Sequence, residues 1–119
     1  MEFNNSKPIY LQIIEDIKKK LIRKEIKPGD KIPSQRELAK NIKVNPNTVQ
    51  RAYREMESMG LVKTLRGQGT FISDEEELLN EIKKEMASEV LIKFIQEMRS
   101  LGFKDDEVIN LIKSWQEKI

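Results

Sequence analysis

The chain has 119 residues, of which 38% are hydrophobic and 35% charged, and it contains neither cysteine nor histidine. This length suits one compact domain with a small appendage. Without those two residue types the chain cannot form disulfides, thiolate metal sites or a histidine general base, so we expect neither an enzyme nor a cofactor. The composition suits a reducing compartment, and neither a signal peptide nor a membrane-spanning run is visible, so we expect a cytoplasmic protein without a membrane partner.

The charge is distributed unevenly along the chain. Residues 1–73 hold 15 Lys and Arg against 8 Asp and Glu, whereas residues 74–119 hold 7 against 12. A basic part followed by an acidic part predicts a domain at 1–73 that binds a polyanion such as nucleic acid, and a separate tail at 74–119. Charge alone also allows two solvated surfaces of opposite sign.

The first predicted element is an amphipathic helix over residues 8–25. Pro8 suits a first helical turn, and apolar side chains then recur at helical spacing. Residues 28–30, Pro-Gly-Asp, break this pattern and leave room for a very short extended piece at 31–33. The expected buried side chains of the helix are Tyr10, Ile13, Ile14, Ile17 and Leu21.

Two further helices carry clear start signals. Ser34 with Glu37 forms a capping box that opens a helix running to about residue 42, with Leu38, Ala39 and Ile42 buried. After a three-residue turn, Asn45 as cap and Pro46 at the first helical position open a helix that continues to residue 59 and ends at Gly60.

A β-hairpin and two tail helices complete the prediction. Strand-like runs at 61–66 and 70–73 flank Gly67-Gln68-Gly69. Ser73 with Glu76 suggests a second capping box that opens a long helix ending at Gly102, and Asp105 can cap a last helix. The expected fold is therefore mainly α with a small β-hairpin wing: a winged helix-turn-helix followed by a two-helix dimerisation tail.

The third helix presents a polar face that suits DNA. At about 100° per residue, Val49, Ala52, Tyr53 and Met56 share one face, and polar side chains lie opposite. Amides and guanidinium groups can read adenine and guanine in the major groove. We assign base edges to Asn47, Thr48, Gln50 and Arg51, phosphate to Arg54, the groove edge to Arg36, and the minor groove to Arg66 and Gln68 beside Gly67 and Gly69. Thr48 as a simple cap, and Arg51 or Arg54 as solvated surface, remain alternatives.

The tail helices are amphipathic and need a partner surface to cover their apolar faces. The predicted dimerisation residues are Ile82, Met86, Val90, Phe94, Met98, Leu111, Ile112 and Trp115. Packing of the tail onto the chain's own first helix is the alternative. A ligand pocket between protomers near Phe94, Phe103 or Trp115 also stays open, so the presence of a small-molecule effector is undecided.

These motifs together resemble the GntR family of bacterial regulators and, within it, the YtrA-like subfamily. The resemblance implies a winged-helix repressor that binds a palindromic operator as a dimer, often near genes for ABC-type transporters. It supports Arg36, Asn45, Asn47, Thr48, Arg51 and the wing glycines as the DNA surface, and a short dimerising tail. Pro46 and Gln50 stand where many other GntR regulators carry arginines, so the base preferences of those relatives cannot be transferred. The matching stretches are Pro8-Ile9-Tyr10 with Gln12, Pro28-Gly29-Asp30, Pro33-Ser34, Arg36-Glu37-Leu38-Ala39, Val44-Asn45-Pro46-Asn47-Thr48-Val49, Arg51-Ala52-Tyr53 and Gly67-Gln68-Gly69-Thr70-Phe71.

The sequence therefore predicts a homodimeric, sequence-specific regulator of transcription bound to double-stranded DNA. A winged helix used for protein interaction, and an architectural DNA binder with little sequence preference, are the two alternatives, because this fold does not dictate function.

Overall fold

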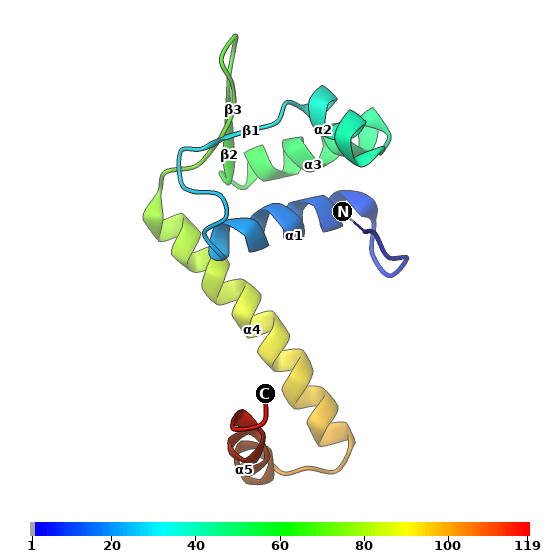
Figure 1. Ribbon diagram of the computed structural model, residues 1–119, viewed down its shortest axis with the longest axis vertical. Coiled ribbons are helices and arrows are strands. Elements are labelled where there is room, and N and C mark those ends of the chain that lie inside the picture. The colour runs from blue at the N-terminus through cyan, green and yellow to red at the C-terminus, as the bar shows by residue number, and fades with distance from the viewer. Residues whose placement is uncertain (1) are drawn as a thin grey trace. The chain divides into compact units, whose positions relative to one another are not determined.

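The computed structural model describes residues 2–119 (Figure 1). The chain divides into two compact units, one that ends at Lys83 and one that spans Lys84–Ile119. Helix α4 (Glu76–Ser100) contributes its first turns to the first unit and its remainder to the second. The boundary that charge suggested, at residue 73, lies just after the last strand of the sheet.

The first unit is a winged helix-turn-helix, as predicted. Two antiparallel pairings form a three-stranded sheet in the order β1-β3-β2, and the hairpin β2–β3 projects beyond the helices (Figure 1). The short extended piece joins this sheet, because Lys31 pairs with Phe71 and Ile32 with Thr70. The elements are α1 (Ile9–Ile22), β1 (Lys31–Ile32), α2 (Gln35–Ile42), α3 (Pro46–Ser58), β2 (Val62–Leu65) and β3 (Gly69–Ile72).

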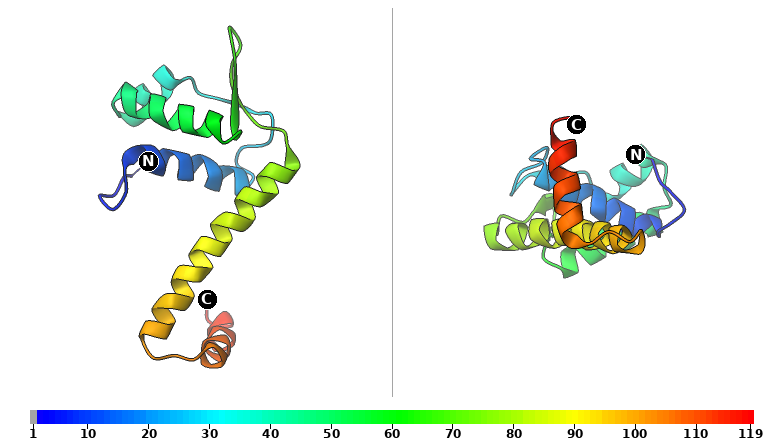
Figure 2. Two further views of the ribbon diagram at one scale, coloured as in Figure 1. Left: turned by 180° about the vertical axis from the view of Figure 1, so that it is seen from behind. Right: turned by 90° about the horizontal axis from the view of Figure 1, so that it is seen from below.

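The core of this unit lies between α1, α3 and the sheet. Helices α1 and α3 run side by side (Figures 1 and 2). The predicted inner face of α3 is fully buried: Val49, Ala52 and Met56 are 0% exposed and Tyr53 is 2% exposed. From α1, the buried side chains are Ile13, Ile14, Ile17 and Leu21. This burial fixes which face of α3 is left for a partner.

The predicted caps of α2 and α3 are present. The Glu37 N–H donates to Ser34 Oγ at 3.1 Å, and the Ser34 N–H donates back to Glu37 Oε1 at 3.3 Å. At the start of α3, the Asn47 N–H donates to Asn45 Oδ1 at 2.8 Å. Of the side chains expected inside α2, only Ala39 is buried, and Leu38 and Ile42 are half-buried.

Helix α1 ends three residues earlier than expected. Its last residue is Ile22, and Lys24 adopts a left-handed conformation with φ of 66°. The Glu25 N–H then donates to the Lys20 carbonyl at 2.8 Å, which closes the helix end. Since glycine is the usual residue for such a closure, a lysine here gave no stop signal in the sequence.

The predicted starts of both tail helices need correction. Ser73 Oγ accepts from the Glu75 N–H at 3.2 Å, and α4 begins at Glu76, so the proposed capping box with Glu76 is wrong. In the second unit, α5 (Asp105–Gln116) includes Asp105 as its first helical residue. Its carboxylate accepts from Arg99 at 2.8 Å, and this hydrogen bond and the positive charge hold the pKa of Asp105 below its ordinary value.

Tyr53 ties α3 to the segment before α2, because its hydroxyl donates to the Pro33 carbonyl. Burial, with a smaller contribution from the charge of Glu37, raises the pKa of Tyr53 to about 12. The unfolded chain has a tyrosine pKa of about 10. The folded state therefore holds this proton more tightly, and the resulting stability is present below about pH 10 and lost as the pH rises to about 12.

We expect Tyr53→Phe to remove this pH dependence. The variant should lose about 1 kcal/mol at neutral pH, because a hydrogen bond disappears, and its free energy of unfolding should fall less steeply than that of the wild type between about pH 10 and 12. Urea unfolding across this range measures both effects, and the titration of lysines is common to the two proteins. Parallel pH profiles would contradict the assignment.

Candidate nucleic-acid interface

The outer face of α3 is polar and open to solvent. Asn47, Gln50, Arg51 and Arg54 are all exposed, on the side of the helix away from the buried stripe. The first turns of α3 therefore present two amides and a guanidinium group, with a second guanidinium one turn further on.

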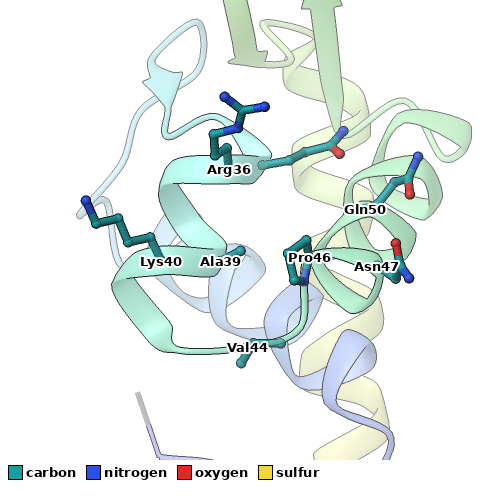
Figure 3. Close-up of a pocket in the computed structure, with 8 residues that line it drawn as sticks. Arg36, Ala39, Lys40, Val44, Pro46, Asn47 and Gln50 are labelled. Atoms are coloured by element: carbon teal, nitrogen blue, oxygen red, sulfur yellow. The ribbon is translucent and has the colours of Figure 1, made fainter.

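A groove lies between α2 and the start of α3 (Figure 3). Its volume is about 660 Å³, and Figure 3 shows Arg36 and Lys40 on α2 and Asn47 and Gln50 on α3, with Ala39 and Pro46 between them. The structure thus brings together three of the predicted DNA-contacting side chains. The full lining is Gln35, Arg36, Ala39, Lys40, Val44, Pro46, Asn47 and Gln50.

The chemistry of this groove suits the edge of a DNA major groove. Its polar side chains are three amides, which can pair with adenine N6 and N7, and two cations, which can bind guanine or phosphate. Arg36 lies in the first turn of α2, where backbone N–H groups without an intrahelical partner and the helix dipole favour an anion. The groove can therefore hold a phosphate group.

Arg51 lies on the other flank of α3 and does not line this groove. Its guanidinium carbon sits 3.9 Å from the centre of the Tyr10 ring, and Nη2 donates to the Tyr10 hydroxyl at 3.2 Å. Helix α1 thus gives Arg51 a defined partner, while the arginine side chain stays exposed to solvent.

Asn45 and Thr48 take different places. Asn45 is the cap of α3, so its side-chain oxygen already accepts a backbone N–H. Thr48 is half-buried and is not that cap, so the capping alternative for Thr48 is wrong. The amide N–H groups of Asn45 take no part in this cap and are donors that a DNA contact could use.

The wing residues lie at the end of the hairpin, away from the groove lining. Arg66 and Gln68 are exposed, and the Gln68 N–H donates to the Leu65 carbonyl at 2.9 Å, which closes the turn. Gly67 and Gly69 have φ of 78° and 124°, values that side-chain-bearing residues rarely adopt. A Cβ at Gly69 would also stand 2.6 Å from Lys31 Cε, so the Lys31 side chain lies against the hairpin at this glycine.

The predicted dimerisation residues divide between the two units. Ile82 is 6% exposed and belongs to the first unit, so it contributes to that unit's interior and has little surface to offer a partner. In the second unit, Val90, Phe94, Ile112 and Trp115 are exposed, with values of 71%, 39%, 43% and 50%. Half-buried members complete the set: Met86, Met98 and Leu111.

The sequence analysis did not single out Gln35 and Lys40 of the groove, nor the contact of Tyr10 with Arg51. Gln35 and Lys40 line the groove, and Lys40 follows Arg36 at a spacing of four, which places both on one side of α2. Tyr10 was assigned only to the core of α1, and the signal that pointed beyond this role was its place in the Pro8-Ile9-Tyr10 motif.

No described residues form a metal-binding cluster of acidic side chains, and across residues 2–119 no helix is both long and apolar enough to span a bilayer.

Comparison with known proteins identifies the relatives of this chain. Residues 9–72 match the family described as bacterial regulatory proteins, gntR family. The chain is 51% identical to the uncharacterized HTH-type transcriptional regulator YhcF of Bacillus subtilis over 98% of its own length and 96% of that protein. It is 44% identical to the HTH-type transcriptional repressor YtrA of the same organism, over 92% of this chain and 85% of YtrA.

Solved structures agree with these matches. A GntR family transcriptional regulator from Listeria monocytogenes superposes with a TM-score of 0.87 at 36% identity, over 94% of this chain and 98% of that one. The DNA-binding domain of AraR, solved in complex with operator ORX1, aligns with 60% of this chain and 93% of its own at a TM-score of 0.55 and 30% identity.

Proposed function

Because this chain belongs to the GntR family of bacterial regulatory proteins, we propose that it is a repressor that binds a palindromic operator as a homodimer. Like its relatives, the chain is a transcription regulator with a DNA-binding domain, and it is not an enzyme. Residues up to 73 are the proposed DNA-binding part, and the tail from residue 74 carries the proposed dimer contact. A protein that works on the bacterial chromosome acts in the cytoplasm, where we place it.

The groove between α2 and α3 carries this proposal. Asn47 and Gln50 extend from the exposed side of a helix whose other side is fully buried, and Arg36 stands across from them (Figure 3). Recognition helices read bases mainly from their amino-terminal turns, which is where both amides lie. We therefore assign base contacts to Asn47 and Gln50, and phosphate or groove-edge contacts to Arg36 and Arg54. Arg51 is a further proposed base contact, and Asn45, Thr48 and the wing tip, residues 66–69, complete the proposed DNA surface.

A selection from random-sequence duplexes, followed by fluorescence anisotropy on the enriched duplex, tests the proposal. Asn47→Ala or Gln50→Ala should each weaken binding to this duplex by about 1–3 kcal/mol and relax the preference at the base pair that the amide reads. The affinity for a scrambled duplex should change little, because phosphate contacts supply it.

Asn41→Ala is the matched control, because it removes an exposed amide from α2 outside the groove lining. This variant should bind like the wild type. Equal affinity of the wild type for enriched and scrambled duplexes would favour an architectural binder. Absence of salt-dependent DNA binding would favour a protein-interaction module.

The exposed apolar side chains of the second unit support the homodimer. Leu91, Ile92, Leu101 and Ile109 are each at least half exposed, in addition to the exposed members of the predicted set. Exposed apolar side chains in this number favour an interaction site. A second copy of the same surface is the simplest partner, since a two-fold contact is self-complementary.

A two-fold dimer implies a palindromic operator. The two copies of α3 would enter successive major grooves about one helical turn apart or somewhat more. The similarity to YtrA, whose name describes a repressor, supports repression by occupation of a promoter. Control of an operon for an ABC-type transporter is the further expectation, and an inverted repeat upstream of such genes, protected by this protein, is the observation that tests it.

A further inference from the structure

Tyr10 belongs to α1, a helix that is not part of the helix-turn-helix, yet it holds a side chain of the proposed DNA surface. The contact joins residues 41 positions apart. It consists of a ring stack at 3.9 Å and a hydrogen bond of 3.2 Å, both to the same guanidinium group of Arg51. Two simultaneous contacts to one planar group fix its orientation more narrowly than either contact alone.

The stack on Tyr10 leaves N–H donors at the edges of the Arg51 guanidinium group available for hydrogen bonds to DNA. A guanidinium group carries five N–H donors in its plane, and an aromatic ring covers only its face. The Tyr10 hydroxyl accepts from Nη2, and the remaining donors are enough for a bidentate contact with guanine O6 and N7. Tyr10 is half-buried, so its ring is held by the protein, whereas Arg51 is exposed and accessible to a partner.

From this geometry we propose that Tyr10 is a positioning residue for DNA recognition, which holds the Arg51 guanidinium with its edges toward the base pairs. This inference rests on the proposed function. Arginine has a flexible stem, and ordering it on binding costs free energy that a partner in the free protein removes in advance. The consequence is that base preference at the Arg51 contact depends on a residue of α1.

The test measures affinity for the duplex enriched by the wild type and for a scrambled duplex, in full-length protein. Tyr10→Leu, which removes the ring and the hydroxyl, should weaken binding to the enriched duplex about fivefold and leave the scrambled duplex within about twofold. Tyr10→Phe keeps the ring, and its affinity for the enriched duplex should fall about twofold because the hydroxyl is lost. Leu11→Ala, at the adjacent exposed position of α1, is the matched control and should bind like the wild type.

A double-mutant cycle separates positioning from a structural role. Arg51→Ala should cost about tenfold on the enriched duplex in the wild-type background and only about twofold in the Tyr10→Leu background. If both backgrounds lose the same factor, or if Tyr10→Leu lowers affinity for both duplexes equally, the inference is overturned. A wild type that enriches no sequence would instead overturn the proposed function, so the two failures are distinguishable.

Discussion

Replacing Ile112 with aspartate should leave the protein monomeric at micromolar concentration and weaken operator binding by about two orders of magnitude. Ile112 is 43% exposed on α5, one turn before Trp115, which is 50% exposed. In the proposed dimer a carboxylate at this position would be buried without a partner, which costs several kcal/mol. A monomer also lacks the DNA-binding domain of the partner protomer. In the dimer, tethering raises the effective concentration of that domain at the other half-site.

Sedimentation velocity measures the first effect and anisotropy on the enriched duplex measures the second. Asn110→Asp is the matched control, because it adds the same charge to an exposed polar position of α5. This control should remain dimeric. A monomeric wild type, or an Ile112→Asp variant that sediments as a dimer, would remove the second unit from the dimer contact.

Leu61→Ala should destabilise the first unit by about 2–5 kcal/mol, a large part of the total stability of a small domain. Leu61 is 0% exposed and lies where α3 gives way to the sheet. Its N–H donates to the Met56 carbonyl at 2.9 Å and its carbonyl accepts from Ser73 at 2.8 Å. Truncation opens a cavity at the point where α3, β2 and the end of β3 converge.

Urea unfolding followed by circular dichroism measures this loss. Met59→Ala provides the comparison, since Met59 lies two residues earlier and is 39% exposed. Its truncation should change the free energy of unfolding by less than about 0.5 kcal/mol. Similar losses in the two variants would mean that burial at Leu61 does not govern the stability of this junction.

The DNA-binding fold was predictable because its signals are local. Ser34 with Glu37, and Asn45 with Pro46, mark helix starts through hydrogen bonds that span two or three residues. The buried stripe of α3 follows from helical periodicity alone, and the structure confirms all four of its members. These features together specify the fold and the exposed face of α3.

Features that depend on long-range contacts or unusual backbone were not predictable. The left-handed conformation of Lys24 ends α1, although lysine rarely adopts it. The pairing of β1 with β3 and the stacking of Arg51 on Tyr10 join segments about 40 residues apart, and no local pattern encodes either contact. The fold of the candidate site was therefore readable from the sequence, and the partners of its side chains were not.

Strand β1 anchors the base of the hairpin β2–β3 and leaves the tip of the hairpin unpaired with it. Through β1, the base of the hairpin is joined to Pro33, whose carbonyl is held by Tyr53 of α3. The tip at residues 66–68 takes no part in the β1 pairing, which ends at Thr70. The tip can therefore be replaced separately: in the proposed DNA complex, a differently charged or longer loop between Leu65 and Gly69 would change the expected minor-groove contact, while the paired part of the hairpin keeps its place beside α3.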